Sequence, residues 1–219
     1  MNSLSQRPME KQNTSSFVFK FRQIASYVPA GSTVLDIGCG AGMLALALRD
    51  KNCMVDGMDL NLNRMWDDNR PNYRTLFEQD IETFDFAASR EKYDVVIFSD
   101  VLEHLKQADR ILTESKEILR EGGKLVISLP NVGYYSNRLG LLLGNWEYQD
   151  EGILDRTHLR FFTLTTAERF IHDNGFSIQT IEAEWPVISS HWKRFVFQSL
   201  CDNFPSLFAI GWVFVAKPE

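Results

Sequence analysis

Short runs of apolar residues alternate along the chain with segments whose apolar residues recur at helical spacing. The clearest run, YDVVIF at 93–98, is apolar on both faces, as a central strand of a parallel sheet is. Strands are predicted at 33–37, 54–58, 74–78, 93–98, 124–129, 177–184 and 207–216. Because these strands alternate with helical segments, we predict an α/β fold with a mostly parallel sheet and helices on both faces.

Helical periodicity marks the segments between the strands. A leading helix is expected to begin near Phe21 and end before Pro29, and another is expected at 43–49. A third should present one apolar face over 111–119, with Gly122-Gly123 as its C-terminal stop.

Two further helices are expected late in the chain. Thr165 and Glu168 have the spacing of a capping box, so a helix should open there and end at Asn174-Gly175. The segment 192–200 is also expected to be helical.

Composition supports one sizeable domain. The 219 residues hold 44% hydrophobic and 24% charged residues, and no linker-like stretch divides them. We expect a single domain over 17–219, preceded by a disordered segment at 1–16. A net charge of −6 argues against nucleic-acid or anionic-membrane partners.

The cysteines and the absence of targeting signals bear on location. Cys39, Cys53 and Cys201 are scattered without zinc-site spacing, which favours a reduced, cytoplasmic protein. No segment has the pattern of a signal peptide or a membrane span.

The stretch VLDIGCGAGML at 34–44 places Gly38, Gly40 and Gly42 between a strand and a helix, where a ligand can approach the backbone. A tight turn without a ligand and a dinucleotide site are the alternatives. The third glycine of a dinucleotide motif would fall at Met43, and the Asp36 carboxylate would repel a pyrophosphate. It would attract the sulfonium and ammonium of S-adenosylmethionine, which is therefore the preferred cofactor.

With these motifs the chain resembles the class I S-adenosylmethionine-dependent methyltransferases from about Gly31 onward. VLDIGCGAG is similar to their first motif, SDVLEHL at 99–105 to their fourth and GGKLVISLPN at 122–131 to their fifth. The resemblance implies a seven-stranded Rossmann-like sheet whose last strand is antiparallel. It also implies these cofactor contacts: Asp36 and the three glycines, Asp59 at the ribose, Asp80 and Ile81 at the adenine, and in addition Leu60 and Ser99.

Methyl transfer to a hydroxyl requires a base, and His158 and His104 are the candidates. His104 could instead brace the helix that follows it. Another alternative is a divalent metal held by Asp100, Glu103 and His104 with His158 as a fourth ligand, as in similar methyltransferases of ubiquinone synthesis. The preferred assignment has no metal.

The segment 131–162, which follows the fifth strand, is long for a connection and is predicted to form a substrate lid over the sheet's carboxyl edge. Within it, LDRTHLRFF at 154–162 should bring His158 to the methyl group, with its pKa lowered by the nearby cations, while Phe161 and Phe162 anchor the lid. The expected substrate contacts are Tyr134, Arg138, Arg156 and Arg160. The alternative is a packed lid whose arginines pair with Asp150, Glu151 and Asp155.

Weaker resemblances concern the acceptor. DRTHLRFFT and FPSLFAIGWVFVAKP resemble methyltransferases of glycan and polysaccharide loci, which implies a small-molecule or glycan-precursor substrate. LPNVGYYSNRLGLLLG resembles a methyltransferase-fold accessory family of methionine biosynthesis that works with an acyltransferase. We therefore expect O-methylation of a small polar or sugar-like acceptor, with a regulatory accessory protein as the alternative.

Overall fold

The structure is a computed structural model, which describes residues 13–186, 197, 199–201 and 203–219. The helices and strands lie in the order α1 Asn13–Ser26, β1 Thr33–Ile37, α2 Met43–Leu48, β2 Met54–Asp59, β3 Thr75–Glu78, β4 Tyr93–Ser99, α3 Ala108–Glu114, β5 Leu119–Pro130, α4 Tyr135–Leu142, α5 Leu164–Asp173, β6 Phe176–Glu184, α7 Pro205–Phe208 and β7 Gly211–Pro218. Among the residues described, no helix is long and apolar enough to cross a membrane.

The strands form one seven-stranded sheet in the order β3-β2-β1-β4-β5-β7-β6. The pairings from β3 across to β5 are parallel, and β7 runs antiparallel to both of its neighbours. The predicted fold class is confirmed, including the reversed last strand. Since β1 pairs with both β2 and β4, the strand order reverses there, and open α/β sheets bind ligands beyond the carboxyl ends at such a point.

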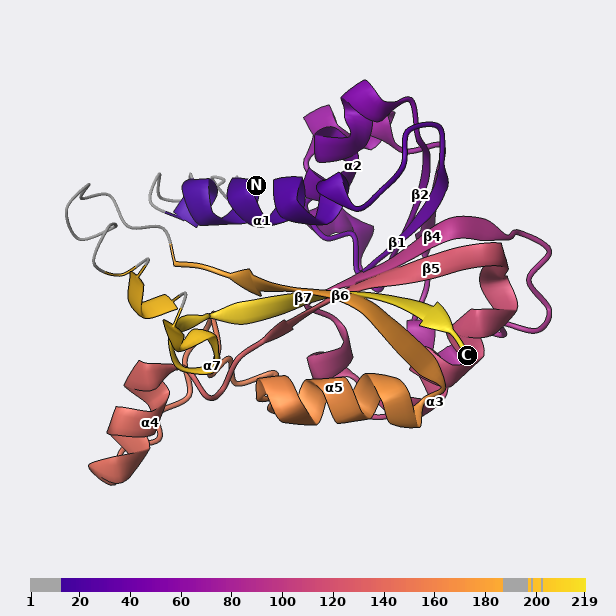
Figure 1. The fold of residues 1–219 in the computed structure, drawn as a ribbon. Coiled ribbons are helices and arrows are strands. Elements are labelled where there is room, and N and C mark those ends of the chain that lie inside the picture. The colour runs from indigo at the N-terminus through magenta and orange to yellow at the C-terminus, as the bar shows by residue number, and fades with distance from the viewer. Residues whose placement is uncertain (1–12, 187–196, 198, 202) are drawn as a thin grey trace.

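Helices cover both faces of the sheet (Figure 1). On one face α1 and α2 pack through residues such as Ile24 and Leu44 against Val34 and Ile97. On the other face α3 and α5 pack against the alternate positions of the same strands, such as Leu35. This alternation explains why the central strands read as continuous apolar runs in the sequence.

The fifth strand begins earlier than predicted. Leu119 pairs with Tyr93, and a register shift separates this pair from the next one, Val95 with Lys124. Gly122 has a φ of 75°. The glycine pair therefore forms an irregularity inside β5, and its interpretation as a helix stop was wrong.

Two other boundaries differ from the prediction. The capping box of α5 is formed by Thr163 and Thr166, whose side chains bond reciprocally to each other's backbone N–H, so the predicted Thr165 pair was wrong. Leu207 belongs to α7, which Pro205 opens, and β7 starts only at Gly211.

Two predicted helices lie near the ends of the chain. The leading helix α1 already begins at Asn13, before the predicted Phe21. Of the predicted helix at 192–200, residues 192–196 and 198 lie outside the described residues.

Candidate active site

The loop after β1 turns at three glycines. Gly38, Gly40 and Gly42 have φ values of 72°, 47° and 80°, which glycine adopts without strain. A Cβ at Gly38 would lie 2.4 Å from Cγ2 of Val101, whereas one at Gly40 would meet nothing closer than the Gly38 carbonyl oxygen, at 3.8 Å. The loop is therefore open at Gly40, and a ligand can approach the backbone there.

Asp59 ends β2 beside this opening. Its Oδ2 accepts the Gly40 N–H at 2.9 Å, and its Oδ1 accepts the Asn61 N–H at 2.9 Å. The Gln79 N–H donates to the Asp59 carbonyl at 2.9 Å, which brings Asp80 to the end of β2. Two carboxylates and an open backbone edge thus line the carboxyl ends of neighbouring parallel strands, and this arrangement fits a cofactor with hydroxyl and amino groups.

The other predicted cofactor residues differ in exposure. Leu60 is 70% exposed, so a ligand can cover its side chain, whereas Ile81 is 7% exposed and belongs to the core. Asp80 caps the short 3-10 turn that follows it. Ser99 ends β4, and its Oγ lies 3.4 Å from Ser128 Oγ. Their contacts with a cofactor stay predictions.

Asp36 is buried within β1. Its Oδ2 accepts a hydrogen bond from Tyr73 Oη at 2.7 Å. Burial and the nearby Asp59 charge raise the pKa of Asp36 to about 7, although the Tyr73 hydrogen bond acts in the opposite direction. The predicted attraction for a positively charged cofactor thus depends on a carboxyl group that is partly protonated near neutral pH.

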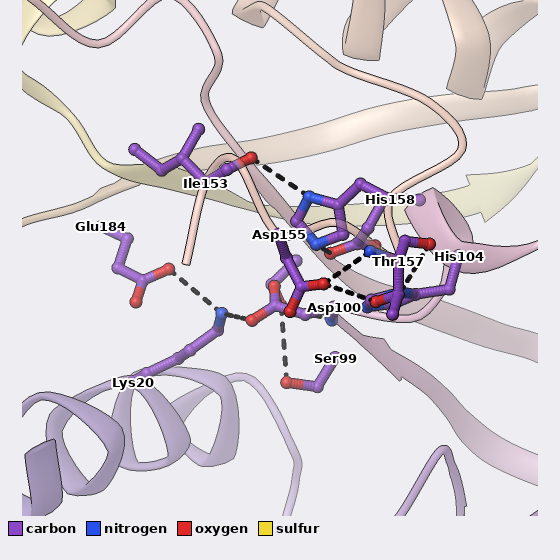
Figure 2. Close-up of polar contacts among 11 residues, drawn as sticks. Lys20, Ser99, Asp100, His104, Ile153, Asp155, Thr157, His158 and Glu184 are labelled. Atoms are coloured by element: carbon purple, nitrogen blue, oxygen red, sulfur yellow. Dashed lines mark hydrogen bonds and ion pairs between the residues drawn. The ribbon is translucent and has the colours of Figure 1, made fainter. Parts of the chain in front are cut away.

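The carboxyl end of β4 carries an ion cluster in which Lys20 and Glu184 are buried and Asp100 is half-buried. Lys20 of α1 pairs with Asp100 and, at 3.2 Å, with Oε2 of Glu184 at the end of β6 (Figure 2). Asp100 has a φ of 53°, and its Oδ1 accepts from Ser128 Oγ at 2.8 Å. Burial raises the pKa of Asp100, but the Lys20 ammonium outweighs this effect and the net shift is downward. Asp100 is therefore ionised.

Glu103 follows Asp100 in the same turn and is fully buried. Within the part of the chain that the structure describes, neither of its carboxylate oxygens has a hydrogen-bond partner. Burial and the charge of Asp100 raise the pKa of Glu103 well above its ordinary value. Its backbone carbonyl accepts the N–H groups of Leu159 at 2.8 Å and Arg160 at 3.2 Å, which holds the 131–162 segment against this turn.

His158 packs on the same turn and is 9% exposed. Its Nδ1 lies 3.1 Å from the Ile153 carbonyl oxygen. Because a carbonyl can only accept, Nδ1 carries the proton and Nε2 is the acceptor of the neutral ring. Nε2 lies 4.0 Å from Oε1 of Glu103. Burial, followed by the effect of His104, lowers the pKa of His158, so the ring is neutral at pH 7.

His104 lies beside His158, with ring centroids 4.7 Å apart and planes at 68°. Its Nδ1 lies 3.0 Å from Thr157 Oγ1 and 3.3 Å from the Thr157 carbonyl oxygen. Thr157 Oγ1 donates to Asp155 Oδ1 at 2.6 Å. Both Thr157 oxygens therefore accept from Nδ1, and the LDRTHLRFF stretch brings the two predicted histidines together (Figure 2).

The two arginines of this stretch form ion pairs. Arg156 binds Asp150 at 2.8 Å with its side chain 61% exposed, and Arg160 binds Asp109 of α3 at 2.5 Å. Arg156 thus pairs with Asp150, as the alternative of a packed lid with paired arginines expects. The prediction that these cations lower the pKa of His158 was wrong about the cause, because burial and His104 are responsible.

An aromatic group lies next to His158. The ring centroid of Phe161 is 6.0 Å from that of His158, and Trp146 and Tyr148 lie 5.5 Å and 6.3 Å from Phe161. Phe162 is 6% exposed and packs on α5, so it anchors the segment as expected.

Tyr134 and Arg138 lie at the start of α4. Arg138 Nε donates to the Gly133 carbonyl at 2.5 Å. Burial, with the neighbouring Tyr135, raises the pKa of Tyr134 to about 12, so the phenol is neutral at pH 7. Their predicted contact with a substrate stays a prediction.

Glu103, His104 and His158 each offer one ligand atom, and these atoms lie within 4.8 Å of one another. A carboxylate with two imidazoles suits a divalent transition metal. Asp100, the remaining ligand of the alternative metal assignment, is instead bound by Lys20 and Ser128. A metal at the remaining three groups stays the alternative to a metal-free site.

Sequence reasoning missed Lys20, Tyr73 and Glu184. Each is placed by a contact between residues far apart in the sequence, 80 positions apart for Lys20 and Asp100 and 37 for Tyr73 and Asp36. A lysine inside the aromatic stretch FVFKF is a signal that could have singled out Lys20.

Residues 11–181 match the model of a methyltransferase-domain family. The chain belongs to this family. S-adenosylmethionine is the cofactor of the class I fold that this methyltransferase domain adopts, and the prediction of this cofactor is confirmed at the level of the family.

Solved structures share the fold of this methyltransferase domain. An S-adenosylmethionine-dependent methyltransferase from Archaeoglobus fulgidus has a TM-score of 0.65 at 18% identity, covering 93% of both chains. Magnesium protoporphyrin IX methyltransferase from Synechocystis PCC 6803, solved with S-adenosylhomocysteine bound, has a TM-score of 0.63 at 17% identity, covering 98% of this chain and 90% of that one. At these identities the likeness concerns the fold alone.

Curated relatives are ubiquinone biosynthesis O-methyltransferases. The human mitochondrial protein is 28% identical over 165 residues, which are 69% of this chain and 43% of the relative. The Glaesserella parasuis protein is 31% identical over 109 residues, or 46% of each. The chain thus spans less than half the length of these relatives. Their names support neither the glycan-locus subgroup nor the accessory family of methionine biosynthesis.

Proposed function

We propose that the protein is an S-adenosylmethionine-dependent methyltransferase that methylates a hydroxyl oxygen of a small polar acceptor. The observation that carries this proposal is the neutral imidazole of His158, whose Nε2 is free to accept a proton in a buried site at the end of β4. A hydroxyl nucleophile must lose its proton as the new bond forms, and a positioned imidazole supplies that step.

The cofactor, when bound, supplies a methyl group on a positively charged sulfur. The resulting thioether is a neutral leaving group that needs no protonation. The open backbone at Gly40 gives it a place at the loop after β1. We assign Asp59 to the ribose hydroxyls and Asp80 to the adenine amine, with Leu60 and Ile81 against the ring. Gly38, Gly42, Asp36 and Ser99 complete the proposed pocket.

The acceptor is proposed to lie between this pocket and the 131–162 segment. Phe161 lies next to His158 and Trp146 and Tyr148 lie next to Phe161, and these aromatic rings suit a ring-bearing molecule. We assign Tyr134, Arg138, Arg156 and Arg160 to its polar or acidic part. Within this arrangement His158 removes the hydroxyl proton through Nε2, and His104 orients the acceptor or the neighbouring ring.

A panel of acceptors tests the function. Phenols and catechols, free sugars, nucleotide sugars, amines and thiols are each incubated with the protein and methyl-labelled S-adenosylmethionine. We expect a methyl ether from a hydroxyl acceptor, with the methylated atom assigned by NMR. Transfer only to nitrogen or sulfur would contradict the proposal. Cofactor binding without transfer to any acceptor class would instead favour an accessory role.

A further inference from the structure

Lys20 is a buried cation that neither cofactor binding nor the proposed proton transfer uses. Its side chain is 8% exposed, and Figure 2 shows it reaching from α1 to a position between Asp100 and Glu184. It therefore joins three elements that lie far apart in the sequence: α1, the turn after β4 and the end of β6.

Two carboxylates bind this ammonium, and the charge of a third, Glu103, also acts on it. Burial alone would lower the pKa of Lys20, but Asp100 and Glu184 outweigh burial and raise it, with a smaller contribution from Glu103. Burial conversely raises the pKa of Glu184 and of Glu103. Lys20 thus stays charged and is the resident counter-ion of an otherwise acidic cluster.

Asp100, which Lys20 binds, precedes a group of side chains of the kinds that bind divalent ions. Asp100, Glu103, His104 and His158 together would offer two carboxylates and two imidazoles. Asp100 is used differently, because one oxygen binds the Lys20 ammonium and the other accepts from Ser128 Oγ. The ammonium also neutralises the charge that would attract a metal ion.

Lys20 further stabilises the backbone of the turn. Asp100 has a φ of 53°, a conformation that non-glycine residues rarely adopt. The turn leads directly to Glu103 and His104, which contact the 131–162 segment. Holding the Asp100 side chain therefore helps to set where both groups lie.

We propose that Lys20 is a positioning residue of the acceptor site that provides its cation in place of a divalent metal ion. The inference rests on the proposed function for its effect on turnover, but not for its effect on metal binding. Removing the Lys20 charge should loosen the turn and, at the same time, free Asp100 and Glu184 to bind an ion.

The experiment compares Lys20→Met, Lys20→Arg and the control Lys51→Met. Lys51 also holds α1, since its Nζ donates to the carbonyls of Ala25 at 2.6 Å and Val28 at 2.8 Å, but it binds only backbone oxygens there. Mn²⁺ binding is measured by electron paramagnetic resonance. Turnover is measured with and without a chelator.

For wild type, Lys20→Arg and Lys51→Met we expect weak Mn²⁺ binding and turnover that a chelator does not change. Lys20→Met should bind Mn²⁺ roughly 10–100-fold more tightly and lose turnover at least about 10-fold, with the Michaelis constant for S-adenosylmethionine unchanged. Adding Glu103→Gln to Lys20→Met should abolish the gained Mn²⁺ affinity and so locate the ion at this cluster.

Unchanged Mn²⁺ affinity in Lys20→Met would overturn the proposal. So would wild-type turnover that a chelator abolishes and Mn²⁺ restores, because the resident cation would then be a metal. If Lys20→Met does not fold, tight Mn²⁺ binding by the wild type that Glu103→Gln abolishes is still decisive against the proposal. If no acceptor is methylated, the proposed function fails while the Mn²⁺ titrations still judge the role of Lys20.

Discussion

The two halves of the candidate site differ in whether backbone groups or ionisable side chains form them. At the ends of β1 to β3, the cofactor half is mostly backbone, as in the open edge at Gly40 and the Gly40 N–H donated to Asp59 from 19 positions away. At the end of β4, the acceptor half consists of buried and half-buried ionisable side chains. Lys20 pairs with Asp100 there across 80 positions, and His104 contacts Thr157 across 53.

This difference predicts which kind of substitution should disturb each half. A backbone pocket depends on which residues can adopt its turns, so added side-chain volume should disturb it. A pocket of buried charges depends on the protonation and pairing of its groups, so isosteric changes of charge should disturb it. The predictions below separate these sensitivities.

The largest effect is expected from one residue in each half. His158→Ala should lower kcat by roughly 10²–10⁴-fold while affinity for S-adenosylmethionine stays nearly constant. Asp59→Ala should weaken cofactor affinity, measured by calorimetry. The control His172→Ala removes an imidazole whose side chain is 71% exposed, and it should change neither quantity. A loss of cofactor affinity in His158→Ala would show that His158 also contributes to cofactor binding, which would contradict the division into two halves.

Volume within the glycine loop gives the next effect. In Gly38→Ala the new methyl group would lie 2.4 Å from Val101 at a φ of 72°, so the free energy of unfolding should fall by about 2–5 kcal/mol. In Gly40→Ala the new methyl group would lie at an ordinary contact distance of 3.8 Å from the Gly38 carbonyl oxygen, so the change should cost about 1–2 kcal/mol. It should nevertheless weaken cofactor binding because the methyl group enters the opening. Urea unfolding and calorimetry measure the two quantities, and equal stability losses would show that Val101 does not restrict Gly38.

Asp36 connects the stability of the cofactor half to pH. Its pKa is raised from 3.8 to about 7 in the folded protein, so the contribution of Asp36 to stability is full below pH 3.8 and is lost as the pH rises to about 7. Asp36→Asn lacks this loss. Its unfolding free energy relative to wild type should therefore increase between pH 4 and pH 7 by up to about 4 kcal/mol and then level off.

Denaturant titrations at several pH values check this prediction. Tyr73→Phe removes the hydrogen bond that lowers the pKa of Asp36, so the pKa should rise further. The pH-dependent loss of stability should therefore extend to higher pH in that variant than in the wild type. A difference between Asp36→Asn and wild type that is constant from pH 4 to pH 8 would contradict the assignment.

The smallest effect is expected at the rim of the acceptor half. Arg156→Ala breaks an exposed pair with Asp150 and should change the unfolding free energy by less than about 0.5 kcal/mol. Arg160→Ala should cost about 1 kcal/mol, because it also loses a cation–π contact in which Cζ lies 5.7 Å from the centroid of the Phe170 ring. Under the proposed function both should raise the Michaelis constant for the acceptor. An unchanged constant in both would leave these arginines a structural role only.

The sequence predicts the cofactor half better because its signals are local. The strand at 33–37 was predicted with the bounds of β1, and the glycine pattern that follows it places the turn before α2. The position of Asp59 could be predicted because a carboxylate that ends a parallel strand lies at the edge of the sheet where ligands bind in open α/β folds.

The acceptor half could be predicted only in part. His104 and His158 were named, but their contact depends on how the 131–162 segment returns to the sheet, which Val132 and Phe162 determine with a hydrogen bond of 2.8 Å. The partner of Asp100 comes from α1, and no local pattern relates position 20 to position 100. Burial of Glu103 likewise follows from packing and not from its neighbours in the chain.

A structure with S-adenosylhomocysteine bound tests the central claim most directly. We predict that Asp59 contacts the ribose hydroxyls beside Gly40 and that the cofactor sulfur points toward Nε2 of His158, with room between them for an acceptor oxygen. A cofactor that binds elsewhere, or whose sulfur points away from His158 and the 131–162 segment, would contradict the assignment of these two halves.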